Sequence, residues 1–390
     1  MLFLLGTGVF LKQISTYYNV NLTENLFGYL ELLGVIGLIM IVLEAAVDLK
    51  ITKDKIPLVR KSILMALLVL LITSLAMGSA IMFLLDEPFF NSLIYAIPLS
   101  VVSSAVLIPS VHSLTQQKKE FLIYESTFSD IIGIMFFNFI VLQEESILNI
   151  GGILNIIFTI IQSVLISYLL VYIFSKFKTG VRIFLIIAIL AILYAVGKKL
   201  HLSSLLLIFI FGLFLNNTKL FFFNKLQGYI DHGAVKKLVK DFHLITAETA
   251  FVVRTLFFVA FGMMIDLNQL LDPKVIIVGS VIIVILYSVR YLNFKMFLKT
   301  DVFPEIFLAP RGLITILLFF QIPAVYEIRG LGMGVLFFVI LATGLIMMMG
   351  LMFSKDSIID EFTVIDFGLG PSSDNANVDK ISKFSEYDDL

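Results

Sequence analysis

One short apolar stretch of the chain contains two carboxylic acids and two hydroxyl groups at helical spacing. The four residues are Glu125, Ser126, Ser129 and Asp130. At 100° per residue, their side chains lie within an arc of about 140° on one helix. Hard cations take oxygen ligands, and a carboxylate can bind a proton instead. The pattern therefore predicts a site that binds either a monovalent cation or H+.

Each carboxyl group also has a structural interpretation. Glu125 could pair with an arginine, and Asp130 could cap a break in a helix. Other charged residues inside apolar segments are few, namely Glu248, Arg254 and Arg290, with Arg311 near the start of a later segment. Glu248 and Arg254 are six residues apart, so they do not face each other on a helix, and we expect each to have a partner elsewhere. An ionisable group at this depth in a membrane costs several kcal/mol, so each one needs a reason.

Two proline-containing stretches predict interrupted helices. Pro98 and Pro109 flank Ser103 and Ser104, and a second stretch reads Pro310-Arg311-Gly312. Proline lacks an N–H and frees the carbonyl four residues earlier. Two interrupted helices in corresponding halves indicate a binding site near the middle of the membrane. A simple kink is the alternative for either break taken alone.

The elements that position these residues are membrane-spanning helices. The chain has 390 residues, 59% of them hydrophobic and 15% charged, with a mean hydropathy of +1.02. Apolar runs of about 18 to 25 residues have the length needed to cross a bilayer, and none alternates like a barrel strand. We predict an all-α polytopic membrane protein with twelve spans: 1–14, 29–49, 60–85, 91–114, 121–143, 149–176, 181–199, 202–216, 245–266, 275–298, 305–323 and 332–353.

Charge and composition limit the possible functions and predict the orientation of the chain in the membrane. The net charge of −1 does not favour nucleic-acid binding, and the absence of cysteine excludes disulfides and thiol chemistry. No cofactor is expected. Lysines and arginines gather in alternate loops, which predicts that these loops are cytoplasmic; Lys198 and Lys199 are the exception. The polar residues 355–390 then form a cytoplasmic tail, predicted to be disordered, on a protein of the cell membrane.

The stretch from Glu125 to Asp130 resembles the Glu-Ser-x-x-Asn-Asp signature of the monovalent cation:proton antiporter superfamily, in its sodium/proton exchanger branch. Residues 257–263 resemble the aromatic-glycine helix of that family, and residues 310–312 resemble its second broken helix. Arg290 occupies the position of an arginine that pairs with the signature glutamate. The resemblance extends from about residue 1 to 353.

The resemblance implies inverted repeats whose two broken helices cross near the membrane midplane. It implies a domain of residues 1–354, with a core (60–143 and 275–354), a scaffold for homodimerisation (1–59 and 181–266) and a linker helix (149–176). Members commonly have thirteen helices, so one more would precede the twelve counted above. Asp130 would bind the cation or proton, with Glu125 and Ser126 assisting and Arg290 neutralising Glu125.

Two positions depart from the family pattern. Ser129 replaces the signature asparagine, and Ser103-Ser104-Ala105 replaces a threonine-aspartate pair, so one expected carboxylate is missing. With no second acid at position 129, we expect one cation (Na+, Li+ or K+) to exchange for one proton. A buried carboxylate is costly in its empty, charged state, which would couple the two fluxes during alternating access.

Three other functions are compatible with parts of the pattern. A cation channel would not need a protonatable acid. An intramembrane enzyme would need two cooperating acids or an Asp-rich magnesium motif, whereas Glu125 and Asp130 lie on one helix. An inactive relative retained as a regulator is suggested by the missing aspartate near Ser104.

Overall fold

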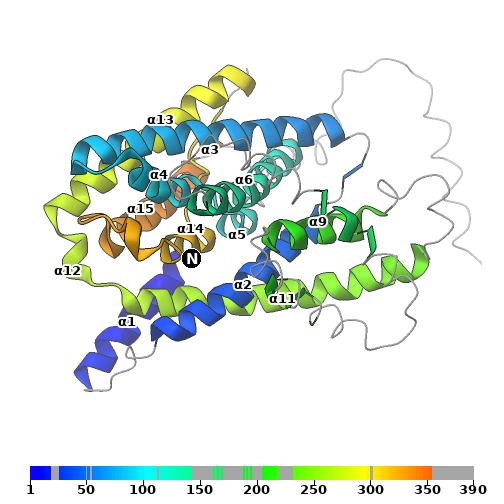
Figure 1. The fold of residues 1–390 in the computed structure, drawn as a ribbon, viewed down its shortest axis with the longest axis horizontal. Coiled ribbons are helices and arrows are strands. Elements are labelled where there is room, and N and C mark those ends of the chain that lie inside the picture. Colours follow the sequence, from blue (N-terminus) through cyan, green and yellow to red (C-terminus); the bar gives the residue numbers. More distant parts are fainter. Residues whose placement is uncertain are drawn as a thin grey trace, which may run out of the picture. The chain divides into compact units, whose positions relative to one another are not determined.

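The computed structural model describes residues 1–18, 26–49, 51–52, 55–111, 114–142, 204–218, 232–298 and 302–353, with scattered residues between 161 and 195. The predicted segment 149–176, most of 181–199 and the tail 355–390 lie outside the described residues. Figure 1 shows the arrangement. The described residues form helices joined by turns and contain no strand, which confirms the all-α prediction.

Most predicted spans correspond to single helices. These are α1 (Leu2–Tyr17), α2 (Leu26–Asp48), α3 (Ile56–Leu85), α6 (Gln116–Leu142), α9 (Ser204–Asn216), α11 (His232–Met264), α13 (Pro273–Leu298) and α15 (Met333–Phe353), with the short α12 (Leu267–Leu270) before α13. Helix α11 begins thirteen residues before the predicted 245 because its polar first third continues the helix beyond the apolar part.

Five stretches of the described residues are helical, long and apolar enough to cross a membrane. They are Ile56–Leu85, Phe89–Ser110, His243–Met264, Pro273–Phe297 and Met333–Phe353. Two shorter apolar helices cover Leu33–Val47 and Leu205–Asn216. At 1.5 Å per residue, α3 alone is about 45 Å long, more than the hydrocarbon thickness of roughly 30 Å.

The two predicted interruptions differ in form. The span 91–114 consists of α4 (Phe89–Ser100), an extended stretch 101–103, α5 (Ser104–Leu107) and a 3₁₀ turn η2 (Ile108–Ser110). The span 305–323 is helical only in its second half, α14 (Leu313–Phe320), followed by the 3₁₀ turn η4 (Ala324–Tyr326). Its first half is a series of turns, because Pro304 and Pro310 lack the N–H groups that a continuous helix would need.

Helix contacts fall into two groups. In the first, α3 packs against α4, α6 and α13, and α13 packs against α15. In the second, α11 packs against α1 and α2, and α2 packs against α9 (Figure 1). Helix α14 contacts α4 and α6 of the first group and also α2 and α11 of the second. Helix α6 of the first group also contacts α9 of the second, so the two groups meet both at the second interrupted segment and along α6.

Candidate ion-binding site

The two interrupted segments cross in direct contact. The Ser103 backbone N–H donates a hydrogen bond to the Pro310 carbonyl at 2.9 Å. Gly312 leaves room for this crossing, since a Cβ atom there would lie 2.6 Å from Ser103 Oγ and 2.8 Å from Val106 Cγ2. Both breaks thus place non-helical backbone inside the protein, which is where such backbone is tolerated at membrane depth.

Asp130 faces the first break. Its side chain is buried, and its Oδ2 atom accepts hydrogen bonds from the Ser104 backbone N–H at 3.0 Å and from the Ser104 hydroxyl. Its Oδ1 atom is also buried but has no hydrogen-bond partner among the described residues. A buried polar atom without a partner costs free energy unless a ligand or water satisfies it. The Asp130 carboxylate therefore has one oxygen anchored to the protein and one available to a ligand.

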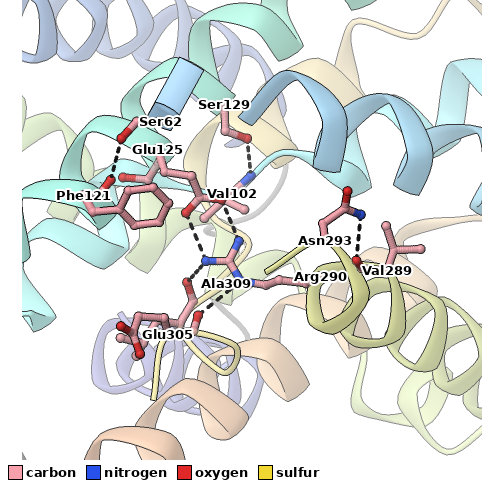
Figure 2. A network of polar contacts seen from close by, with 12 residues as sticks. Ser62, Val102, Phe121, Glu125, Ser129, Val289, Arg290, Asn293, Glu305 and Ala309 are labelled. Atoms are coloured by element: carbon pink, nitrogen blue, oxygen red, sulfur yellow. Dashed lines mark hydrogen bonds and ion pairs between the residues drawn. The ribbon is translucent and has the colours of Figure 1, made fainter. Parts of the chain in front are cut away.

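The three other serines predicted for the site have different roles. Ser129 Oγ accepts a hydrogen bond from the Val102 backbone N–H at 3.0 Å, which joins α6 to the extended stretch (Figure 2). Ser103 Oγ is buried and has no partner within the described part of the chain. Ser126 is also buried, but its hydroxyl donates to the Ile123 carbonyl of its own helix at 3.2 Å. The structure thus brings Ser103, Ser104 and Ser129 to the break and turns the Ser126 hydroxyl toward its helix backbone.

Glu125 and Arg290 form a fully buried ion pair. Arg290 Nη1 and Nη2 donate to the two Glu125 carboxylate oxygens at 2.7 and 3.0 Å. Arg290 also donates to the carbonyls of Glu305 at 3.2 Å and Leu308 at 3.1 Å, and its guanidinium carbon lies 4.3 Å from the centre of the Phe294 ring. Figure 2 shows the guanidinium between α6 and the turns that precede Pro310. Arg290 therefore fastens α6, α13 and the second interrupted segment together.

Arg311 binds the end of α4. Its Nε and Nη2 donate to the carbonyls of Leu99 at 2.7 Å and Ser100 at 3.1 Å, and its Nη1 donates to the Ala309 carbonyl at 2.7 Å. The last carbonyls of a helix have no partner within it and carry the negative end of its dipole. Arg311 is 1% exposed, so it lies at the break and not at the membrane surface.

Several charged or polar partners were not anticipated from the sequence. Thr343 Oγ1 accepts a hydrogen bond from the Arg311 backbone N–H at 3.2 Å, and a lone threonine in an apolar helix gives no signal of such a role. Arg254 pairs with Glu44 at 3.0 Å, whereas Glu248 is exposed. Glu44 could have been found, because it is an acid inside the apolar run of α2.

Comparison with known proteins identifies the family. Residues 2–353 match the protein family described as sodium/hydrogen exchanger, transmembrane. The chain belongs to this family. It is therefore a multi-pass membrane antiporter of Na+ and H+ and not an enzyme, which confirms the predicted function class and removes the intramembrane-enzyme alternative.

Solved structures share the fold of this exchanger. The sodium proton antiporter MjNhaP1 from Methanocaldococcus jannaschii at pH 8 has a TM-score of 0.66 and 19% identity, covering 89% of this chain and 97% of that chain. An electron-microscopy structure of the same antiporter has a TM-score of 0.61 and 18% identity, covering 94% and 92%. A search of curated protein sequences finds no match. The antiporter fold expected from the resemblance is confirmed.

Proposed function

We propose that this exchanger works by competition between a monovalent cation and a proton for the Asp130 carboxylate. The observation that carries the proposal is the difference in hydrogen bonding between the two oxygens of the Asp130 carboxylate. Oδ2 is held by Ser104, while Oδ1 is buried without a partner in the described residues. One oxygen positions the group, and the other accepts either ligand.

The neighbouring oxygens give the cation a partial shell. We propose that Ser103 Oγ, which is also buried without a described partner, is a second ligand. Ser104 and Ser129 hold the carboxylate and the extended stretch in place through the bonds described above. Glu125 supports the site indirectly, because its charge is already matched by Arg290.

The charge balance suggests one-for-one, electroneutral exchange. With Glu125 neutralised by Arg290, Asp130 is the acid at the crossing that can change its ligand. The proton-bound and cation-bound states are both close to neutral, while the empty state leaves a buried charge. Movement of the empty site across the membrane is therefore disfavoured, and this couples the two fluxes.

We further propose a division into a moving core and a fixed scaffold. The core comprises 60–143 and 275–354, and the scaffold comprises 1–59 and 181–266. This division is supported by the two groups of helix contacts, which meet around α14 and along α6. A homodimer held by the scaffold, the cell membrane as location and a cytoplasmic tail at 355–390 are part of the same proposal.

The test is Asp130→Asn in inside-out membrane vesicles that carry a proton gradient. We expect addition of Na+, Li+ or K+ to dissipate the gradient with the unmodified protein and to leave it unchanged with the variant. Asp272→Asn is the matched control, because Asp272 is exposed and its capping oxygen is retained in asparagine. Exchange retained by folded Asp130→Asn protein would refute the proposal. Cation flux without any pH change would indicate a channel, and no flux with the unmodified protein would indicate a regulator.

A further inference from the structure

Two neighbouring core helices carry exposed basic side chains at one end. Arg60 and Lys61 lie in the second turn of α3, Lys295 lies in the last turn of α13, and all three are exposed. Helices α3 and α13 pack against each other, and neither contains an aspartate or a glutamate. We call Arg60, Lys61 and Lys295 the basic face. The mechanism proposed above does not use these charges.

Contacts with Phe121 of α6 bring the two basic helix ends together. Ser62 Oγ of α3 donates to the Phe121 carbonyl at 3.4 Å (Figure 2), and the Phe294 ring of α13 lies edge-on to the Phe121 ring, with centres 5.9 Å apart. Lys61 and Lys295 are the sequence neighbours of these two contact residues. Ser62 and Phe294 are buried, and successive side chains of a helix point 100° apart, so the two lysines turn away from α6.

The exposed side of α3 continues from the basic residues as an apolar stripe. It includes Ile63, Leu64, Ile72, Leu75 and Phe83. At 1.5 Å per residue, the stripe from Ile63 to Phe83 is about 30 Å long, which is roughly the thickness of the hydrocarbon layer. An exposed apolar stripe of this length fits the lipid chains. The basic residues that precede it therefore lie at the depth of the lipid headgroups.

Lys295 has the surroundings of a lysine at the edge of the hydrocarbon layer. Its Nζ atom lies 5.6 Å from the centre of the Tyr291 ring and 3.5 Å from the Tyr291 hydroxyl. Tyr291 is exposed, and tyrosine is enriched where the hydrocarbon layer meets the headgroups. Leu292 and Met296 are also exposed on this part of α13. Lys295 thus combines a charged end at the headgroups with apolar neighbours for the lipid chains.

Other lysines of this region are paired, whereas the basic face is not. Lys55 lies 2.8 Å from Glu120, and Lys118 lies 3.4 Å from Glu305. These two pairs use acids of α6 and of the turns before Pro310. No carboxylate in the described part of the chain pairs with a residue of the basic face. Its positive charge is therefore left for a partner outside these residues.

We propose that the basic face is a docking surface for anionic phospholipids of the leaflet predicted to be cytoplasmic. Phosphate-bearing headgroups supply the negative charge that α3 and α13 lack, and basic residues near a membrane surface attract such lipids. The apolar stripes contact the lipid chains. Basic residues that served only to orient the chain in the membrane would not select one lipid over another.

The docked lipids would also act on exchange, a step that rests on the proposed function. Helices α3 and α13 belong to the proposed moving core. Headgroups bound to the basic face hold the core at the depth at which that face meets them, so movement of the core away from this position becomes slower. Anionic lipid is therefore expected to lower the maximal rate of exchange.

The first experiment measures lipid binding by native mass spectrometry of the full-length protein purified in detergent. Phosphatidylglycerol and phosphatidylcholine with identical acyl chains are added in equal amounts. We expect the unmodified protein to retain at least about threefold more phosphatidylglycerol, and Arg60→Gln/Lys61→Gln/Lys295→Gln to lower this ratio at least about twofold. An unchanged ratio would overturn the proposal. If the triple variant does not fold, the three single variants carry the test, and an unchanged ratio in all of them has the same meaning.

The matched control is Lys274→Gln. Lys274 is an exposed lysine at the opposite end of α13, and its backbone N–H donates to Asp272 at 2.9 Å, so an acid lies beside it. We expect this variant to retain the two lipids in the same ratio as the unmodified protein. A fall as large as that of the triple variant would show that any lysine of the helix has this effect, which would overturn the assignment to the basic face.

The second experiment measures the maximal rate of exchange at saturating Na+ in liposomes of phosphatidylcholine alone and of equal parts phosphatidylcholine and phosphatidylglycerol. We expect phosphatidylglycerol to slow the unmodified protein about threefold and to slow the triple variant much less. Saturating Na+ removes the effect of a charged membrane on the local Na+ concentration. Equal slowing of both proteins, or none, would overturn the effect on exchange.

The two proposals fail in different ways. Folded Asp130→Asn protein should retain the two lipids in the same ratio as the unmodified protein, because Asp130 is not part of the basic face. If Asp130→Asn retains exchange while the triple variant loses its lipid preference, only the proposed role of Asp130 fails. If Asp130→Asn is inactive while the triple variant keeps its preference, only the docking surface fails.

Discussion

Ser104 donates two hydrogen bonds to the same carboxylate oxygen of Asp130, one from its backbone N–H at 3.0 Å and one from its hydroxyl. The family pattern has a threonine-aspartate pair in this stretch. Ser104 therefore contributes a hydrogen-bond donor where an aspartate would contribute a negative charge. This arrangement anchors the carboxylate without adding a second negative group. It also makes the Ser104 side chain testable separately from its backbone.

We predict that Ser104→Ala raises the apparent KM for Na+ about tenfold and leaves the protein folded. The hydroxyl bond to a charged group contributes about 1.5–3 kcal/mol, and each 1.4 kcal/mol corresponds to a tenfold change in affinity. The backbone N–H bond is retained. The KM is measured in vesicles at alkaline pH, with Ser92→Ala as control, since that buried hydroxyl donates to the carbonyl of Pro88, the residue before α4. An unchanged KM would mean that the amide alone positions Asp130.

Arg290→Met should lower the thermal stability of the purified protein more than Glu125→Gln does. Removing Arg290 leaves the Glu125 carboxylate buried without its partner, at a cost of about 3–5 kcal/mol, and also frees the carbonyls of Glu305 and Leu308. Glu125→Gln leaves those two backbone bonds in place. The double variant should be more stable than Arg290→Met alone, because no buried carboxylate remains.

The comparison is made by following thermal unfolding in detergent with tyrosine fluorescence, since the chain has no tryptophan. Equal losses for the two single variants would contradict the assignment of Arg290 as the residue that also fastens the 302–308 turns.

Arg311→Lys should abolish most exchange although the charge is conserved. The guanidinium reaches three carbonyls, those of Leu99, Ser100 and Ala309, through three separate nitrogens. A lysine ammonium is a single point on a flexible stem and cannot reproduce this fork. Exchange in vesicles and melting temperature are measured together. Arg329→Lys is the control because Arg329 is exposed, and normal exchange by Arg311→Lys would show that charge alone suffices.

Gly312→Ala should disturb the crossing of the two interrupted segments. The added methyl group would lie 2.6 Å from Ser103 Oγ and 3.0 Å from Ser103 Cβ, so one backbone segment must move. We expect a loss of about 1–3 kcal/mol in stability, as for overpacking elsewhere, and a large fall in exchange rate. Gly332→Ala is the matched control, since nothing lies within 4 Å of its added methyl group.

The double variant Gly312→Ala/Ser103→Gly should recover part of the stability, because it removes one of the two clashing side chains and leaves the contact with Val106. Recovery of exchange is not expected if Ser103 Oγ is a cation ligand. Full activity of Gly312→Ala would show that the two segments have space to separate.

The spans that the structure describes were predictable because their signal is local. The apolar run that became α15 and the face that carries Glu125 and Asp130 follow from hydropathy and helical period, which need no information about neighbours. The break between Pro98 and Ala105 was predictable for the same reason. The prediction of helix in the first half of 305–323 was wrong. Pro304 and Pro310 cannot donate helical hydrogen bonds, and Arg290 binds the carbonyls of Glu305 and Leu308, so turns are favoured there.

The sequence by itself determined the membrane fold, the acids at depth and the two interruptions, because lipid imposes length, apolarity and backbone pairing on every span. Only the tertiary structure decided which partners the polar groups take. Arg311 binds the end of α4, and Arg254 pairs with Glu44, 210 residues away. These pairings depend on distances between segments that are remote along the chain. The helical periodicity of a single segment gives no information about those distances.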